Sequence, residues 1–170
     1  QQADAQCAAE LLLAIVDHKD TVLLFDTATF AAPVKAEGLH GAILDLVVGR
    51  DAVVATTEAT TALWSYSGRS LGELAAPEGE KLSHVALSPD GKTLARALQK
   101  DAVLAQRLDD PSTLHEVSRG KGLVASLRFV DFSIRAWREG HSIAVMAHDT
   151  PVGSMRSPVF VRVGAFDPLD

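Results

Sequence analysis

Short apolar segments alternate with turn residues along most of this chain, and their order repeats. One unit has apolar segments at residues 42–48, 52–56, 61–66 and 70–74. The same order returns about 40 residues later, with segments at 84–87, 93–97, 101–105 and 113–117. Upstream, segments at 11–15, 21–26 and 30–34 fit the last three segments of an earlier unit. Downstream, segments at 124–130, 142–146 and 158–163 fit a fourth unit with longer insertions between its strands.

These segments have the composition of strands. They are rich in Val, Leu and Thr, and turn signals separate them at intervals of roughly 8 to 12 residues, a pattern typical of all-β proteins. In Ser88-Pro89-Asp90-Gly91 the proline fixes φ and the glycine accepts a positive φ, which favours a tight reversal between two strands. A short helix is the competing interpretation at residues 3–16, where Ala, Glu and Leu are good helix formers.

Three stretches resemble the repeats of WD40-type β-propellers. His84-Val-Ala-Leu-Ser-Pro-Asp-Gly-Lys-Thr-Leu-Ala is similar to their inner strand and turn, and Thr61-Ala-Leu-Trp-Ser-Tyr-Ser-Gly is similar to their third strand. Thr21-Val-Leu-Leu-Phe-Asp matches that third strand with Phe25 in place of Trp. No unit carries the family's Gly-His pair near the start of a repeat, and no Trp-Asp pair closes the third strand, so the repeats are degenerate.

The resemblance implies a single β-propeller segment over residues 1–170, with about four WD40-like, four-stranded blades. The approximate blades are residues 8–36, 40–76, 82–118 and 123–165, and the first lacks its innermost strand. In the WD40-type family that these repeats resemble, a ring usually has seven or eight blades, so we expect this segment to belong to a larger ring. An isolated arc leaves sheet faces uncovered. We therefore expect the ring to be completed by more of the same polypeptide or by a partner chain, unless the protein is an unusually small closed propeller. We also expect other protein partners.

Composition limits the partners and the compartment. A formal net charge of -6 disfavours a nucleic-acid binder, which gathers Lys and Arg on one face. The longest apolar runs are too short to span a bilayer, so we expect a soluble chain. The single cysteine, Cys7, cannot form an internal disulfide, which mildly favours a reducing compartment. We expect an intracellular, cytoplasmic location and leave an organelle open.

A nucleophile elbow is one catalytic possibility. Gly68-Arg69-Ser70-Leu71-Gly72 has the G-x-S-x-G spacing that exposes a serine hydroxyl on a strained strand-to-helix turn in α/β-hydrolases. The helix that should follow is interrupted at once by Pro77 and Gly79. A third strand, a turn and an outer strand explain the same residues better.

Histidines and carboxylates offer a second possibility. No histidine pair has metal-ligand spacing, and Asp17-His18-Lys19-Asp20 is better explained as a solvated turn. Asp45 and Asp131 interrupt apolar inner strands, where a carboxylate must be hydrogen-bonded or face water. We predict structural hydrogen bonds for both, with a channel-facing site as the alternative. No catalytic, cofactor-binding or metal-ligating residue is assigned, and we expect no cofactor.

Residues 130–142 depart most from the repeat. Repeat folds place insertions on loops, often at a binding face, and a tryptophan flanked by arginines has the composition of an interface anchor. We therefore predict an interaction site at Phe132, Arg135, Trp137 and Arg138. Arg119, Lys121 and Arg128 nearby are interleaved with acidic residues and indicate a mixed surface rather than a basic patch.

The sequence as a whole predicts a non-catalytic scaffold that mediates protein–protein interactions within a complex. The alternative is a propeller enzyme or small-ligand binder that uses channel-facing Asp and His residues. A serine hydrolase built on Ser70 ranks below both.

Overall fold

The computed structural model describes residues 12–100, 102–119, 123–130, 132–138, 142–147 and 160–165, and within 137–165 it describes the backbone only. All regular structure in these residues is β-strand, as the turn spacing predicts, and they contain no helix long and apolar enough to cross a membrane. Residues 12–16 form a strand, so the helix considered for residues 3–16 is wrong over that part. The rest of that segment, with Cys7, lies outside the described residues.

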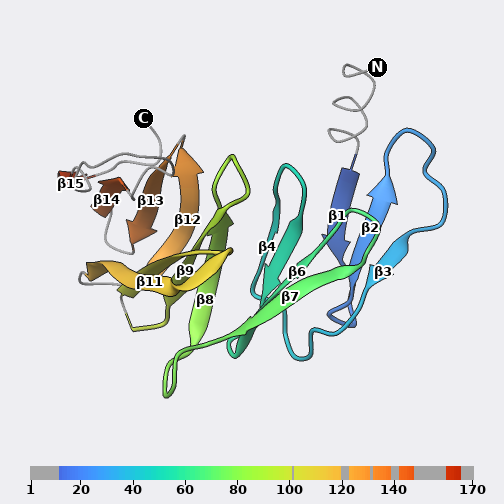
Figure 1. The fold of residues 1–170 in the computed structure, drawn as a ribbon, viewed down its shortest axis with the longest axis horizontal. Coiled ribbons are helices and arrows are strands. Elements are labelled where there is room, and N and C mark those ends of the chain that lie inside the picture. The colour runs from blue at the N-terminus through green and yellow to red at the C-terminus, as the bar shows by residue number, and fades with distance from the viewer. Residues whose placement is uncertain are drawn as a thin grey trace.

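The strands form four antiparallel sheets, each built from strands that are consecutive in the chain (Figure 1). Sheet 1 contains β1 (Leu12–Val16), β2 (Val22–Asp26) and β3 (Val34–Ala36). Sheet 2 contains β4 (Asp45–Val48), β5 (Val53–Thr56), β6 (Thr60–Trp64) and β7 (Ser70–Ala75). Sheet 3 contains β8 (Leu82–Leu87), β9 (Thr93–Leu98), β10 (Ala102–Arg107) and β11 (Asp110–Arg119). Sheet 4 contains β12 (Val124–Val130), β13 (Ser133–Arg138), β14 (Ser142–Ala147) and β15 (Phe160–Ala165).

Two sequence predictions about strands are wrong. The third segment of sheet 1, expected at residues 30–34, is β3 and starts only after Pro33. Proline has no N–H to give to a ladder, so the chain pairs beyond it. The stretch 130–142, interpreted as an inserted loop, contains β13, which pairs with both β12 and β14. There the alternation of Ile134 and Ala136 with polar residues is a strand pattern.

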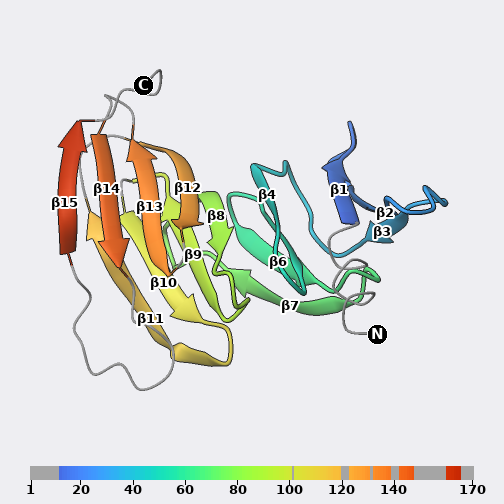
Figure 2. The same cartoon turned by 90° about the horizontal axis from the view of Figure 1, so that it is seen from above.

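Consecutive sheets pack face to face in chain order, and a separate buried cluster fills each of the three junctions (Figure 2). Because successive side chains of a strand point to opposite faces, each middle sheet supplies one face to the sheet before it and one to the sheet after it. Val53 belongs to the cluster shared with sheet 1, and the next residue, Val54, to the cluster shared with sheet 3. Likewise Leu94 packs toward sheet 2 and Ala95 toward sheet 4.

Polar groups also join the sheets. The indole N–H of Trp64 in β6, a side chain only 1% exposed, donates to the carbonyl oxygen of Glu37 after β3 at 2.9 Å. Arg96 in β9 is 3% exposed and donates to the carbonyl oxygens of Leu74 (3.4 Å) and Ala75 (2.9 Å) at the end of β7. Its other terminal nitrogen donates to Gln106 Oε1 at 3.0 Å. Burial lowers the pKa of Arg96, and these three oxygens solvate its guanidinium in place of water.

Candidate functional site

A groove runs along the edge strands β4, β8 and β12, which we call the inner strands. Its volume is about 540 Å³, and it is lined by polar and apolar side chains of all three strands. The three strands begin three different sheets yet lie on the same side of the molecule (Figure 2). At this groove the structure brings together Asp45, which the sequence marks as a candidate, and His84 of β8.

Asp45 is held by hydrogen-bond donors from two sheets. Its Oδ1 accepts the N–H of Leu46 at 2.9 Å, and its Oδ2 accepts the N–H of Val85 at 3.1 Å. His84 Nδ1 lies 3.4 Å from the same Oδ2, with about a quarter of each side chain exposed. A carboxylate with this many donors is well stabilised in a half-buried position. Asp45 therefore acts as a tie between β4 and β8, which is the structural role predicted for it; Asp131 lies outside the described residues.

The groove holds the contact between Asp45 and His84 and, among the described residues, no metal cage. Among the described residues, no three His, Cys, Asp or Glu side chains come together as metal ligands would. What the groove offers is one carboxylate, one imidazole, the guanidinium of Arg128 and the hydroxyl of Ser126, together with apolar side chains such as Leu87 and Phe129. It could receive a small polar ligand or a peptide side chain.

A second groove, of about 580 Å³, lies between sheet 1 and the segment that leads to β4. Its charged lining residues are of both signs: Lys19, Asp20, Lys35 and Glu37. Asp20 Oδ1 accepts the N–H of Ile43 at 3.1 Å, which ties this segment to the turn before β2. The mixed charges favour no particular ligand.

The four predicted interaction residues lie along one hairpin. Phe132 is in the turn between β12 and β13 and is 39% exposed. Arg135 lies in β13 and is half-buried, with a buried Nε that has no hydrogen-bond acceptor. Trp137 and Arg138 also lie in β13, but their side chains fall outside the described residues. Only Phe132 therefore has the turn position that the loop interpretation gave to all four.

The serine motif does not form a nucleophile elbow. Gly68 has a φ of +83° in the turn, as a tight reversal requires, but Ser70 is the first residue of β7 and no helix follows. Ser70 is exposed and pairs in register with Trp64. The residues thus form the third strand, turn and outer strand that explain the motif without catalysis.

The cluster at residues 17–20 is a turn held by Asp17. Asp17 Oδ1 accepts the backbone N–H groups of Thr21 at 3.0 Å and Lys19 at 2.8 Å. These two bonds, with that of Thr21 the stronger influence, lower the pKa of Asp17. His18 is exposed beside it, so the predicted solvated turn is confirmed.

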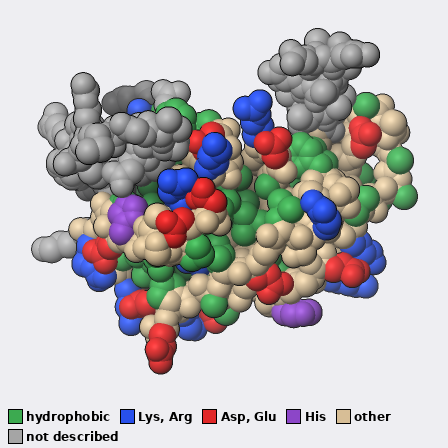
Figure 3. Space-filling view, viewed as in Figure 1, with side chains coloured by type: hydrophobic (Ala, Val, Ile, Leu, Met, Phe, Trp, Pro, Cys, Tyr) green, Lys and Arg blue, Asp and Glu red, His purple; other side chains and the backbone are tan. Residues whose placement is uncertain are grey.

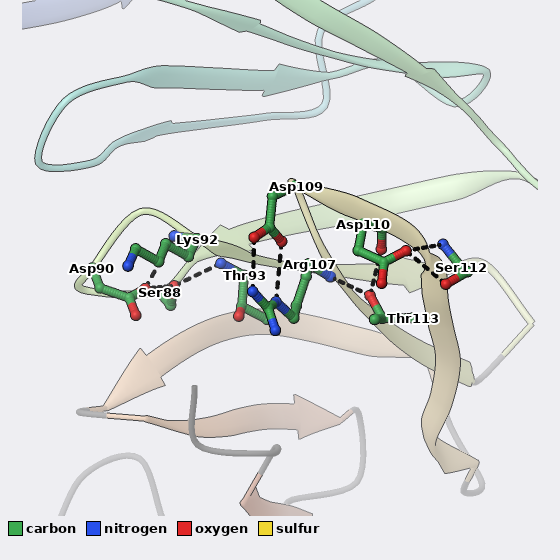
Figure 4. A network of polar contacts seen from close by, with 9 residues as sticks. All are labelled: Ser88, Asp90, Lys92, Thr93, Arg107, Asp109, Asp110, Ser112 and Thr113. Atoms are coloured by element: carbon green, nitrogen blue, oxygen red, sulfur yellow. Dashed lines mark hydrogen bonds and ion pairs between the residues drawn. The ribbon is translucent and has the colours of Figure 1, made fainter. Parts of the chain in front are cut away.

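Two turns of sheet 3 carry a chain of polar contacts at one end of the sheet (Figure 4). In the Ser-Pro-Asp-Gly turn, Ser88 Oγ donates to Asp90 Oδ1 at 2.6 Å and accepts the N–H of Thr93 at 2.9 Å. In the β10–β11 turn, Arg107 forms a double hydrogen bond with Asp109 at 3.0 and 2.7 Å. These contacts fix turn geometry rather than form a cavity. Arg119 similarly pairs with Glu116, at 2.7 Å, which fits a mixed surface.

Sequence reasoning missed Arg96, the most deeply buried charged side chain described. The available signal was an arginine inside the alternating segment 93–97, at a position where the neighbouring unit has Ala55. Two of its three acceptors are backbone oxygens of another sheet, which no side-chain motif records.

Comparison with known proteins finds no matching family model and no similar curated protein.

Proposed function

We propose that this chain forms consecutive WD40-like blades of a β-propeller and serves as a non-catalytic, intracellular scaffold that holds protein partners. One observation supports this proposal above the others. Four antiparallel sheets, each of consecutive strands, stack face to face in chain order with β4, β8 and β12 on the same side. Propeller blades are radial sheets of this kind, and their inner strands line a central channel.

The distribution of apolar side chains supports partner binding at the turns. Phe30, in the turn before β3, is 67% exposed, and Phe132, before β13, is 39% exposed. Large aromatic residues presented by a rigid framework are common anchors of protein interfaces. Hydrophobic side chains also gather over the middle of the face in Figure 3, where sheets 2 and 3 meet, with charges of both signs around them.

Affinity purification of the tagged full chain tests the scaffold role. We expect Phe30→Ala and Phe132→Ala to reduce recovery of specific partner proteins while leaving the circular dichroism spectrum unchanged. Leu71→Ala is the matched control, because Leu71 is an apolar side chain of similar exposure, 48%, on the outer strand β7. Equal recovery by all three variants would contradict the proposed binding surface.

A ligand-binding or enzymatic role is the second candidate, because Asp45 and His84 meet in the inner-strand groove. Both oxygens of Asp45 already accept backbone N–H groups, which favours the structural interpretation. His84→Ala separates the two roles. A scaffold keeps its partners in this variant, whereas loss of a biological activity with partners still bound would favour the ligand site.

A further inference from the structure

The three sheet junctions follow one rule in the second strand of each unit. At the junction of sheets 2 and 3, Val54 of β5 shares a buried cluster with Leu94 of β9. At the next junction, Ala95 of β9 shares a cluster with Ile134 of β13. At the first, Ala14 of β1 packs on the cluster that contains Val53 of β5. In each case, a residue in the second strand of one unit shares a cluster with a residue in the second strand of the next unit. Counted by position in the repeat, the residue of the next unit stands one place earlier than its partner.

Applied to the two ends of the stack, this rule identifies the outward-facing residues. Ala14 faces sheet 2, so Leu13 faces away from it; Ile134 faces sheet 3, so Arg135 faces away from it. Leu13 is the counterpart of Val53 and Leu94. Arg135 is the counterpart of Val54 and Ala95.

The outer face of sheet 1 has the composition of a covered face. Leu13 pairs with Phe25, and Ile15 with Leu23, so these four side chains share that face. Their counterparts in sheet 2 are buried, and they all belong to the cluster against sheet 1: Val53, Ala55, Ala62 and Trp64. In sheet 1, however, Leu13 remains 44% exposed and Ile15 38% exposed. An exposed apolar face of this kind marks an interaction surface.

On the outer face of sheet 4, one described side-chain donor has no acceptor. The Nε of Arg135 is buried and makes no hydrogen bond, a costly state for a charged group. Arg96 shows how the same side chain is satisfied within the fold, because its guanidinium donates to carbonyl oxygens of the adjacent sheet. An adjoining sheet would supply Arg135 with acceptors of the same kind.

We propose that sheet 4 of one copy of this chain packs on sheet 1 of a second copy, and that the reciprocal contact closes a ring of two chains. The contact repeats the three junctions already present and places Arg135 next to Leu13 of the other copy. A head-to-tail contact used twice around a two-fold axis leaves neither end uncovered. Two copies of four sheets stay within the typical range of propeller blades. The inference rests on the propeller arrangement in the proposed function and names a second copy as the partner that completes it.

Light scattering and cysteine cross-linking of the full chain test the proposal. We expect a particle of twice the 18.0 kDa chain mass. Ile15→Lys should lower the dimer fraction at least about tenfold, because it buries an unpaired charge in the contact. Val48→Lys, at an apolar residue of similar exposure, 43%, on the inner strand β4, should leave the dimer intact. Circular dichroism checks that both variants fold.

Cross-linking separates head-to-tail from symmetric contact. In a Cys7→Ser background, a copy with Leu13→Cys should form a disulfide with a differently tagged copy that carries Arg135→Cys. It should form none with a copy that carries Leu71→Cys on the outer strand. A monomer, or a dimer linked only between two Leu13→Cys copies, would overturn the proposed contact. The scaffold role would survive either result, because partner recovery by the turn variants tests it independently.

Discussion

The carboxylate of Asp45 accepts the backbone N–H of Val85, a residue 40 positions later in the chain, at 3.1 Å. Val85 lies on β8, an edge strand of sheet 3, and Asp45 lies on β4, an edge strand of sheet 2. An N–H on a free edge has no ladder partner in its own sheet. The preceding sheet supplies one here, so the same bond satisfies the edge and fixes the position of one sheet against the next.

Replacement of Asp45 should therefore loosen the junction of sheets 2 and 3. Asp45→Ala leaves the N–H groups of Leu46 and Val85 without this acceptor, and we expect a loss of about 1 to 2 kcal/mol in the free energy of unfolding. Asp45→Asn retains one acceptor oxygen and should lose less. Urea denaturation measures this free energy. Glu78→Ala, at an exposed loop residue, is the control, and its free energy of unfolding should stay within about 0.5 kcal/mol of wild type. A wild-type midpoint for Asp45→Ala would exclude the tie.

Arg96 should contribute more than Asp45 because it is almost wholly buried. Arg96→Ala leaves a cavity and deprives Ala75 and Gln106 of their donor, so we expect a loss of about 3 kcal/mol in the free energy of unfolding. Arg96→Lys supplies one ammonium in place of a planar fork and should recover only part of this loss. Arg69→Ala, at an exposed turn, is the control. If Arg96→Ala and Arg69→Ala unfold at the same urea concentration, the guanidinium does not join the sheets.

Much of the β-structure could be predicted because strand and turn signals are local. The period-2 alternation and the Ser-Pro-Asp-Gly turn locate β8 and β9 to within two residues, and β12 has the predicted bounds. β13 was missed because its outward positions carry Arg135 and other polar residues, which were interpreted as the charges of an exposed loop. A strand at the end of a stack can carry such charges because one of its faces lies outside the three described junctions.

The candidate site was predictable only in part. Because Asp45 lies inside an apolar segment, its carboxylate is expected to accept structural hydrogen bonds, and the bonds from Leu46 and Val85 confirm that expectation. Its meeting with His84 depends on how two sheets are placed against each other, which no local pattern specifies. Arg96 illustrates the same limit, since its partners in the preceding sheet are the backbone oxygens of Leu74 and Ala75.

Acid should weaken the turn between β1 and β2 through Asp17. Hydrogen bonds from Thr21 and Lys19 lower the pKa of Asp17 in the folded state. The stabilisation is complete above the unfolded pKa, near 3.9, and disappears as the pH falls through the lower folded pKa. In Asp17→Asn the urea midpoint should therefore lie below that of wild type near neutral pH. The difference should shrink as the pH falls below about 4; a constant difference down to the lowest pH would contradict the role of the charge.

Ser70 should not react as a catalytic nucleophile, although its motif has the spacing of one. An activated serine stands on a strained turn before a helix, where backbone N–H groups form the oxyanion hole, whereas Ser70 begins a strand and pairs with Trp64. We expect no covalent labelling by a fluorophosphonate probe under conditions that label a known serine hydrolase. Ser70→Ala should change the free energy of unfolding by no more than about 0.5 kcal/mol, as surface substitutions usually do. Labelling that disappears in Ser70→Ala would show that β7 can rearrange into an elbow, and would favour the hydrolase over the scaffold.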